Sequence, residues 1–307
     1  MTIALNDLTE LTEEFVRNPG QLIGIPIALV GAVFMSFGAQ YQHRGVAKVE
    51  RQGAASESGL NVRQVVALLQ RPSWVIGTVM LGLAIVLQLS ALAFAPLIIV
   101  QPLGAVALVV TAILNSRMSH VKLNRDSKIA ITACVAGVAL FVTFAAFAAG
   151  ERPVSDGQLL TVLWILAGVL VAAAISFILF RKRSRALYYI VAAGIIYAFV
   201  ATLAKVIINR IQNDNVDWLT ILCLVGLLVA AAVGAYFVQN AYSSGPPDLV
   251  IAGLTVIDPM VAVGIGIVVL GEASGASAWT VAGFIVSGLI AVWGVFKLAS
   301  SHPQVAE

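Results

Sequence analysis

Two charged side chains interrupt the apolar parts of this chain, and they are the first candidates for chemistry. The chain has 18 Lys and Arg and 15 Asp and Glu residues, but only Lys205 and Asp258 lie well inside an apolar run, with Lys297 at the edge of the last one. An ionisable group in apolar surroundings is costly and commonly functional. Asp258 is therefore the strongest candidate for binding a cation (as the only metal ligand we expect) or for taking up and releasing a proton.

Both residues also permit a structural interpretation. Asp258 precedes Pro259, and an Asp N-cap followed by proline at the first helical position typically begins a helix. Asp258 could thus cap a helix that restarts after a break. Lys205 lies four residues from the end of its run, so we expect its ammonium group to reach the polar headgroups of a membrane. The alternative is that Lys205 lines a vestibule for an anionic solute.

Several amide side chains also lie within apolar runs. Buried amides should face the interior of a helix bundle, either around a polar binding site or as links between helices. These amides, which we expect to bind substrate together with Asp258 and Lys205, are Gln88, Gln101, Asn115, Gln239 and Asn240. Gln101 precedes Pro102 as Asp258 precedes Pro259, and each proline predicts a helix break that frees a backbone carbonyl.

The sequence contains no candidate residues for enzyme chemistry. There is no nucleophile elbow, phosphate-binding loop or metal-spaced Cys/His cluster, and the glycine-rich segment 264–271 lies within an apolar run with the wrong spacing for a dinucleotide site. We therefore expect no catalytic residue, and no cofactor other than a transported Mg²⁺ ion or a coupling proton.

Composition indicates where these residues must lie. The 307 residues are 60% apolar and 11% charged, with a mean hydropathy of +0.98. A typical soluble domain has about 25% charged residues, enough to cover its surface. These figures exclude a soluble enzyme, a disordered chain and a nucleic-acid-binding domain. The sequence instead predicts a polytopic helical membrane protein, of the all-α class.

Nine continuous apolar runs have the length of about 20 residues that a membrane-spanning helix needs. Because the runs do not alternate with polar residues, they exclude a membrane β-barrel. The predicted spans are 21–41, 72–95, 97–116, 129–148, 158–180, 187–209, 218–240, 249–270 and 278–297.

The loop charges predict an orientation. With nine spans, 14 basic residues fall on one side of the membrane and 3 on the other, so the first side is cytoplasmic. The N-terminus, in an extracytoplasmic segment 1–20, is then outside, and a tail at 299–307 is inside. We expect the cytoplasmic (plasma) membrane as the location.

A weak internal repeat relates two parts of the chain. Shifted by 150 residues, the segment 91–122 falls on 241–272, and the succession of span, short connection, span, polar loop and span recurs. The charge pattern makes the copies inverted across the membrane, an arrangement typical of secondary transporters. We expect a four-helix half at 21–148 and a five-helix half at 149–298, with a solute site between them.

The segment 90–131 resembles the NIPA family of magnesium transporters, within the drug/metabolite transporter (DMT) superfamily and near its EamA-like branch. The matching residues are Ala91 to Pro96, Pro102 to Ala105, Ala112 to Ser116, and Leu123–Asn124. In the second half, Pro259 and Gly271–Glu272 resemble the general superfamily pattern. The resemblance implies a permease that moves a small solute by alternating access, with Mg²⁺ as the first candidate.

One position departs from the family pattern. Many members of the NIPA family have an acid three residues before the amide at Gln88, where this chain has Ile85. The departure favours an alternative, an exporter of a small organic metabolite or drug. A non-transporting membrane scaffold or lipid-handling protein also stays open. The expected partners are the lipid bilayer and a small solute or cation, with a homodimer as an option and no nucleic acid.

Overall fold

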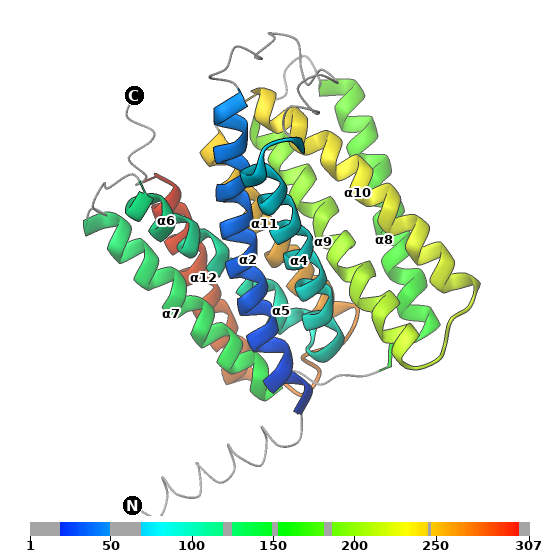
Figure 1. The fold of residues 1–307 in the computed structure, drawn as a ribbon. Coiled ribbons are helices and arrows are strands. Elements are labelled where there is room, and N and C mark those ends of the chain that lie inside the picture. Colours follow the sequence, from blue (N-terminus) through cyan, green and yellow to red (C-terminus); the bar gives the residue numbers. More distant parts are fainter. Residues whose placement is uncertain are drawn as a thin grey trace, which may run out of the picture.

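The computed structural model describes residues 19–49, 69–118, 125–148, 153–180, 186–244 and 247–300, and these form helices joined by short connections (Figure 1). The predicted terminal segments 1–20 and 299–307 therefore lie almost wholly outside the described residues. The helices are α2 (Pro19–Val49), α4 (Pro72–Phe94), α5 (Leu97–Leu103), α6 (Val106–Met118), α7 (Arg125–Ala148), α8 (Asp156–Phe180), α9 (Ala186–Gln212), α10 (Trp218–Ser244), α11 (Pro247–Val268) and α12 (Ala278–Ser300).

The prediction of an all-α membrane bundle is confirmed. Within the described ranges, eight helical segments are long and apolar enough to cross a membrane, with α5 and the first part of α6 counted as one. The remaining predicted span, 249–270, corresponds to α11, whose continuous apolar stretch, Gly253–Val268, is shorter. Helices satisfy their backbone hydrogen bonds internally, which is what lipid surroundings require.

Proline sets the boundary between α4 and α5. Ala95, the residue before Pro96, is extended at φ −138° and ψ 151°, because a residue before proline is driven out of the helical region. The chain turns there and α5 runs back along the bundle. We call the end of the bundle that contains this α4–α5 turn the junction end.

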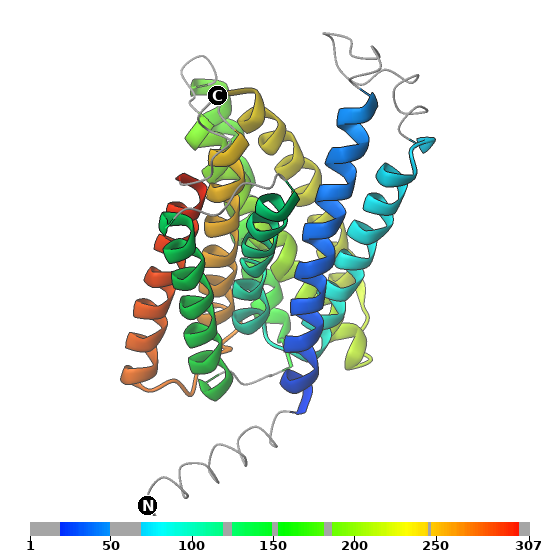
Figure 2. The same cartoon turned by 60° about the vertical axis from the view of Figure 1, so that its left-hand side comes forward.

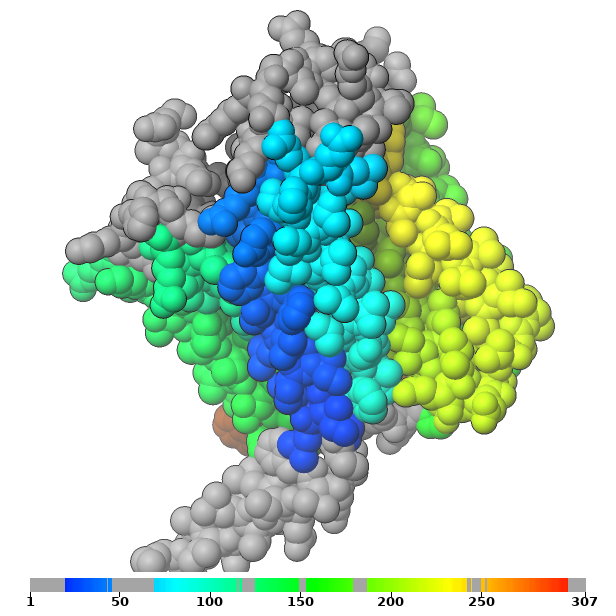
Figure 3. All heavy atoms as spheres, viewed as in Figure 1, coloured from blue at the N-terminus to red at the C-terminus, as the bar shows by residue number. Residues whose placement is uncertain are grey.

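Glycines allow two helix pairs to approach closely. Gly24, Gly31 and Gly38 recur every seven residues on α2, and a Cβ atom on each would meet residues of α4 within 3.3 Å. Figure 3 shows α2 and α4 side by side on one face of the molecule. On α7, a Cβ on Gly137 would lie 2.5 Å from the Ala291 backbone of α12, and both cartoon views show these helices together (Figures 1 and 2).

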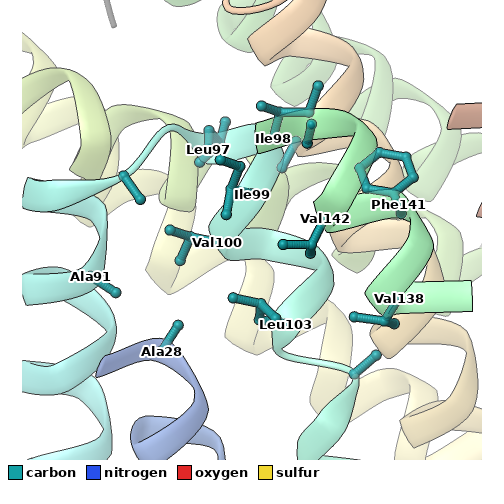
Figure 4. Packing of buried hydrophobic residues seen from close by; sticks show 14 of the residues in the cluster. Ala28, Ala91, Leu97, Ile98, Ile99, Val100, Leu103, Val138, Phe141 and Val142 are labelled. Carbon is teal, nitrogen blue, oxygen red and sulfur yellow. The ribbon is translucent and has the colours of Figure 1, made fainter. Parts of the chain in front are cut away.

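The buried residues form two main clusters. The first cluster gathers residues of α2, α4, α5, α6, α7 and α12, and Figure 4 shows α5 at its centre. The second cluster gathers residues of α8, α9, α10 and α11. Helices α9 and α11 contribute to both clusters, through Ala198 and Ala262 to the first and through Ile196 and Ile265 to the second. The seam between the clusters therefore runs along α9 and α11.

Candidate functional site

Asp258 lies near the middle of α11, on the side that packs against α9. The residue keeps some exposed surface, but its Oδ1 atom is buried and has no hydrogen-bond partner within the described part of the chain. A buried carboxylate oxygen without a partner loses its hydration and gains nothing in return. Such an oxygen is available to a ligand that brings its own charge or hydrogen-bond donors.

The structure contradicts the alternative interpretation, in which Asp258 caps a restarted helix. Helix α11 runs from Pro247 to Val268 without interruption, with Pro259 inside it. The break predicted at Pro259 is therefore absent. At Pro102 the sequence was more informative, because α5 ends at Leu103 and α6 begins at Val106. The Asp258 side chain is thus left without the capping role that would have explained it.

The neighbours of Asp258 place it at the seam between the core clusters. A Cβ atom on Gly194 of α9 would lie 2.7 Å from the Ile257 side chain and 3.4 Å from the Asp258 nitrogen. The hydroxyl of Tyr197, one turn along α9, lies within electrostatic range of the carboxylate. Ile257 packs on the second cluster and Ala262 belongs to the first. Asp258 therefore lies where the two groups of helices meet.

The amides predicted around Asp258 are only partly brought into the interior. Gln101 of α5 is buried, and Gln88 of α4 is half-buried. Gln239 of α10 is exposed, so the expectation that it faces the interior is wrong. Asn240 donates its amide to the Tyr236 carbonyl of its own helix at 2.7 Å. Only Gln101 is therefore a buried amide on a helix that packs against α11.

Asn115 lies in α6, and its side chain lies outside the described part of the structure. The position of Ile85 is informative instead. Its side chain is 60% exposed on the outer surface of α4. An acid at position 85 would therefore point away from the helix bundle. The absence of that acid removes no ligand from the interior.

Lys205 does not reach for headgroups, so the expectation of a lipid-facing lysine is wrong. The residue is buried on α9, and its Nζ atom donates to the carbonyl oxygens of Leu92 at 2.8 Å and Ala95 at 3.0 Å. These carbonyls are at the C-terminal end of α4, where helices have unpaired acceptors and a partial negative charge. The ammonium group therefore binds the end of a neighbouring helix rather than lining a solute vestibule.

Glu272 is the residue that reasoning from the sequence missed. It follows α11 directly, is buried, and accepts hydrogen bonds from the Leu97 and Ile98 nitrogens of α5, each at 2.9 Å. Two glycines make this possible. Gly271 has φ +71°, and a Cβ on Gly266 would lie 2.7 Å from the Glu272 carboxylate. The Gly271–Glu272 pair was visible in the sequence, but its distant partners were not.

Arg210 lies just beyond the predicted span 187–209, yet its side chain is fully buried at the junction end. Its Nη1 atom donates to Asp156 at 2.6 Å, and its Nη2 atom forms an ion pair with Asp217 at 2.8 Å. Its Nε atom donates to the Asn215 carbonyl and to the Thr220 hydroxyl, each at 3.0 Å. The guanidinium group thus ties together the ends of α8, α9 and α10.

Asp217 illustrates the electrostatics of this network. Burial raises the pKa of its carboxyl group, but hydrogen bonds from Thr220 and the charge of Arg210 outweigh burial, so the pKa lies below its usual value. The carboxylate also begins α10, since the Thr220 nitrogen donates to it at 3.1 Å. The network stabilises the fold.

The structure contains a cavity of about 350 Å³ between α5, the α5–α6 connection, α7, α11 and α12. Both predicted helix-break prolines, Pro102 and Pro259, line it, together with Phe141 and Gly288, and its walls are almost entirely apolar. A polar cavity lined by Asp258 and the amides was expected, and this cavity contains neither Asp258 nor Gln101 among its lining residues. It suits an apolar group rather than a hydrated ion.

The donor set favours one class of metal chemistry. Among the described residues, no three His, Cys, Asp or Glu side chains lie close enough to hold a metal ion together. A dehydrated Ca²⁺ or Zn²⁺ site needs such a group, whereas Mg²⁺ keeps several waters and binds through one or two carboxylates. A single buried carboxylate such as Asp258 is compatible with a largely hydrated Mg²⁺ ion.

Relatives of the chain can now be compared with this arrangement. An uncharacterized protein of Corynebacterium glutamicum is 24% identical over 252 residues, covering 82% of this chain and 86% of that protein. The human "Magnesium transporter NIPA4" is 28% identical over 135 residues, which cover 43% of this chain and 32% of the human protein. The "Probable magnesium transporter NIPA3" of Arabidopsis thaliana is 27% identical over 114 residues, covering 37% and 30%.

No solved structure matches the chain. The family model described as "Magnesium transporter NIPA" matches residues 20–301, which includes every helix described above except the first residue of α2. The resemblance read from the segment 90–131 is thereby confirmed. The match extends through α9 and α11, the helices on which Lys205 and Asp258 lie. The chain is a multi-pass membrane protein that belongs to the NIPA magnesium transporter family.

Proposed function

We propose that the protein carries Mg²⁺ across the cytoplasmic membrane and is not an enzyme, with Asp258 as the anionic ligand. The observation that carries the proposal is the buried Asp258 Oδ1 atom, which has no partner in the described structure although it lies at mid-helix between two packed clusters. Family membership suggests Mg²⁺ as that cation. A substrate cation would supply the positive charge that the buried carboxylate lacks as a partner.

The chemistry of Mg²⁺ suits a site with a single acid. The ion dehydrates reluctantly, so a transporter that strips only some of its waters needs few protein ligands. Asp258 would bind one face of the hydrated ion, and the amide oxygen of Gln101 could accept hydrogen bonds from its waters. Weak binding of this kind also allows release, which a carrier requires.

The helix contacts support alternating access between two halves. The close pair of α2 and α4 has a counterpart in α9 and α10, and α2 packs on α6 as α9 packs on α11. The last helices of the halves, α7 and α12, pack against each other in antiparallel directions. This pattern fits halves at 21–148 and 149–298, with α8 outside the correspondence. Rocking of one half against the other would expose Asp258 to each side in turn.

The first experiment measures Mg²⁺ uptake into proteoliposomes that contain a fluorescent Mg²⁺ indicator. Asp258→Asn should reduce the initial rate about tenfold or more, because a neutral amide replaces a charged ligand. Gln239→Leu is the matched control, since Gln239 is a polar residue of a membrane helix that faces outward. The proposal is wrong if Asp258→Asn, folded and inserted, transports Mg²⁺ at the wild-type rate.

A coupling proton can be tested with the same vesicles. If Asp258 exchanges Mg²⁺ for a proton, wild-type uptake should change the lumenal pH, and Asp258→Asn should abolish that change. Uptake that leaves the lumenal pH constant in the wild type excludes coupling without excluding Mg²⁺ transport.

The apolar cavity favours a second candidate, an exporter of a small organic solute. A cavity of about 350 Å³ has the size of a small-ligand site. Gly288 lines it, and a Cβ there would still lie 3.8 Å from Phe141, so Gly288→Leu would fill the cavity without a clash at the Cβ. Under this alternative, Gly288→Leu abolishes export of apolar organic solutes from cells, whereas under the Mg²⁺ proposal it leaves Mg²⁺ uptake unchanged.

A further inference from the structure

The α4–α5 turn brings together two helix ends of opposite partial charge. The last carbonyls of α4 carry partial negative charge, and the first N–H groups of α5 carry partial positive charge. Only the extended residue Ala95 and Pro96 separate the two helices. Figure 4 shows Leu97 and Ile98 at the start of α5, directly after this turn. In the lipid environment both sets of backbone groups need partners.

Side chains from the second half of the chain bind both helix ends at this turn. Lys205 of α9 binds the Leu92 and Ala95 carbonyls, and Gln212 at the end of α9 donates to the Ala93 carbonyl at 2.9 Å. Glu272 accepts from Leu97 and Ile98. A cation therefore meets the negative helix end, and an anion meets the positive one.

The segment that carries Glu272 is itself held in place. Gln158 of α8 donates its amide to the Val269 and Leu270 carbonyls at 2.9 and 3.2 Å. Gly266 leaves the space that the Glu272 carboxylate occupies. Lys205 and Glu272 are both more than nine-tenths buried. Their bonds to the turn therefore form without competition from bulk water, which makes them stronger than surface contacts.

We infer that Lys205 and Glu272 are positioning residues of a gate that closes the junction end of the transporter. They bind no substrate, and they act by holding the α4–α5 turn of the first half against α9 and the segment after α11. Each of these bonds joins the two halves. Under alternating access, the halves must separate at this end for the Asp258 site to open there, so these bonds must break during the cycle. The inference rests on the proposed alternating access.

The experiment measures the distance between spin labels at the junction end in lipid vesicles. The labels are attached to cysteines at Phe94 and Ser274, both exposed, after the native Cys134 and Cys223 are replaced by alanine. Glu272→Gln and Lys205→Met should each increase the population with the longer distance about tenfold, the expected result of losing hydrogen bonds to a charged group.

Two further variants make the test specific. Gly266→Ala leaves both charges intact but displaces the Glu272 carboxylate, so it should also open the junction end, and it provides the test if a charge variant fails to fold. Lys297→Met is the matched control, because Lys297 forms an exposed ion pair with Asp126 at 3.3 Å at the opposite end. It should leave the distances unchanged. Unchanged distances in folded Glu272→Gln and Gly266→Ala, or equal opening in Lys297→Met, would overturn the inference.

Transport kinetics distinguish a gate from a merely structural bond. A gate variant should change the maximal Mg²⁺ rate more than the half-saturating concentration, because the binding site itself is intact. Opening of the junction end in a protein that does not transport Mg²⁺ would support the gate and contradict the proposed substrate. Mg²⁺ transport with unaltered distances in the gate variants would support the proposed substrate and contradict the gate.

Discussion

Buried charges occur in two regions of this molecule, and they differ in how they are satisfied. At the junction end, Arg210, Lys205 and Glu272 are each bonded to carboxylates, carbonyls or backbone nitrogens. At the middle of α11, the Oδ1 atom of Asp258 has no partner among the described residues. A charge that is paired with an opposite charge or a helix end stabilises an arrangement of helices, whereas an unpaired one is maintained at a cost to stability. The difference separates residues that hold the fold from the residue we assign to the cation.

The comparison is tested most strongly at Arg210. Arg210→Met leaves Asp156 and Asp217 without their common partner. It also removes the side chain that joins the ends of α8, α9 and α10. We expect a loss of about 3 kcal/mol in the free energy of unfolding, the upper end for hydrogen bonds to charged groups, because the guanidinium group is buried although its carboxylate partners are partly exposed to solvent. The measurement is the midpoint of heat-induced loss of monodisperse protein in detergent.

Arg44→Met is the control for Arg210, because Arg44 is exposed and lies over the Tyr41 ring, at 5.8 Å to its centroid. A similar midpoint for Arg210→Met and Arg44→Met would mean that the buried network contributes little.

A smaller loss is expected at Gln158, a neutral residue of the same region. Gln158→Leu removes the amide that caps the Val269 and Leu270 carbonyls and the oxygen that accepts from Ser155. The expected cost is about 1–3 kcal/mol, the cost of leaving partly buried groups unsatisfied. Thr161→Val provides a control, because the Thr161 hydroxyl bonds only to its own helix at Gly157. Equal midpoints for the two variants would contradict this role.

The sequence predicted the helices better than it predicted the contacts between them. Continuous apolar runs located the spans to within a few residues, and glycines at every seventh residue of α2 are a pattern typical of a close helix pair. Both signals are local in the chain. Lys205 was misjudged because its distance from the end of a helix said nothing about the exposed carbonyls of α4, more than a hundred residues away.

The candidate site shows the same limit. Asp258 was found because a single acid in an apolar run needs no knowledge of neighbours. Glu272 was not assigned a role, since an acid in a loop is ordinary until its partners in α5 are known. Gln239 and Ile85 were interpreted without knowing which faces of α10 and α4 point outward. Hydrophobic periodicity is weak in helices that are apolar all around, so it could not orient those faces.

Asp217 predicts how the stability contributed by a bonded carboxylate depends on pH. Its pKa is lower in the folded protein than its ordinary value of 3.8, so the carboxylate form is favoured by folding. The stability that it contributes is therefore fully present above about pH 4 and is lost as the pH falls through the folded-state pKa. Asp217→Asn should lower the unfolding midpoint at pH 7, and the difference from wild type should shrink below pH 4. Asp214→Asn, at an exposed turn residue with φ +51°, should show no such trend. A difference that is constant with pH would rule out this linkage.

Asp258→Asn should have the smallest effect on stability, and this is the sharpest form of the comparison. The substitution removes a charge whose Oδ1 atom has no hydrogen-bond partner in the described structure, so no bond to Oδ1 is broken. The unfolding midpoint should stay equal to that of the wild type or rise, because a neutral amide is less costly to bury than an unpaired carboxylate. A clear fall, comparable to that of Arg210→Met, would mean that Asp258 is bonded in the membrane as the junction residues are. A stable Asp258→Asn protein that has lost Mg²⁺ uptake would instead show that this carboxylate is needed for transport and not for folding.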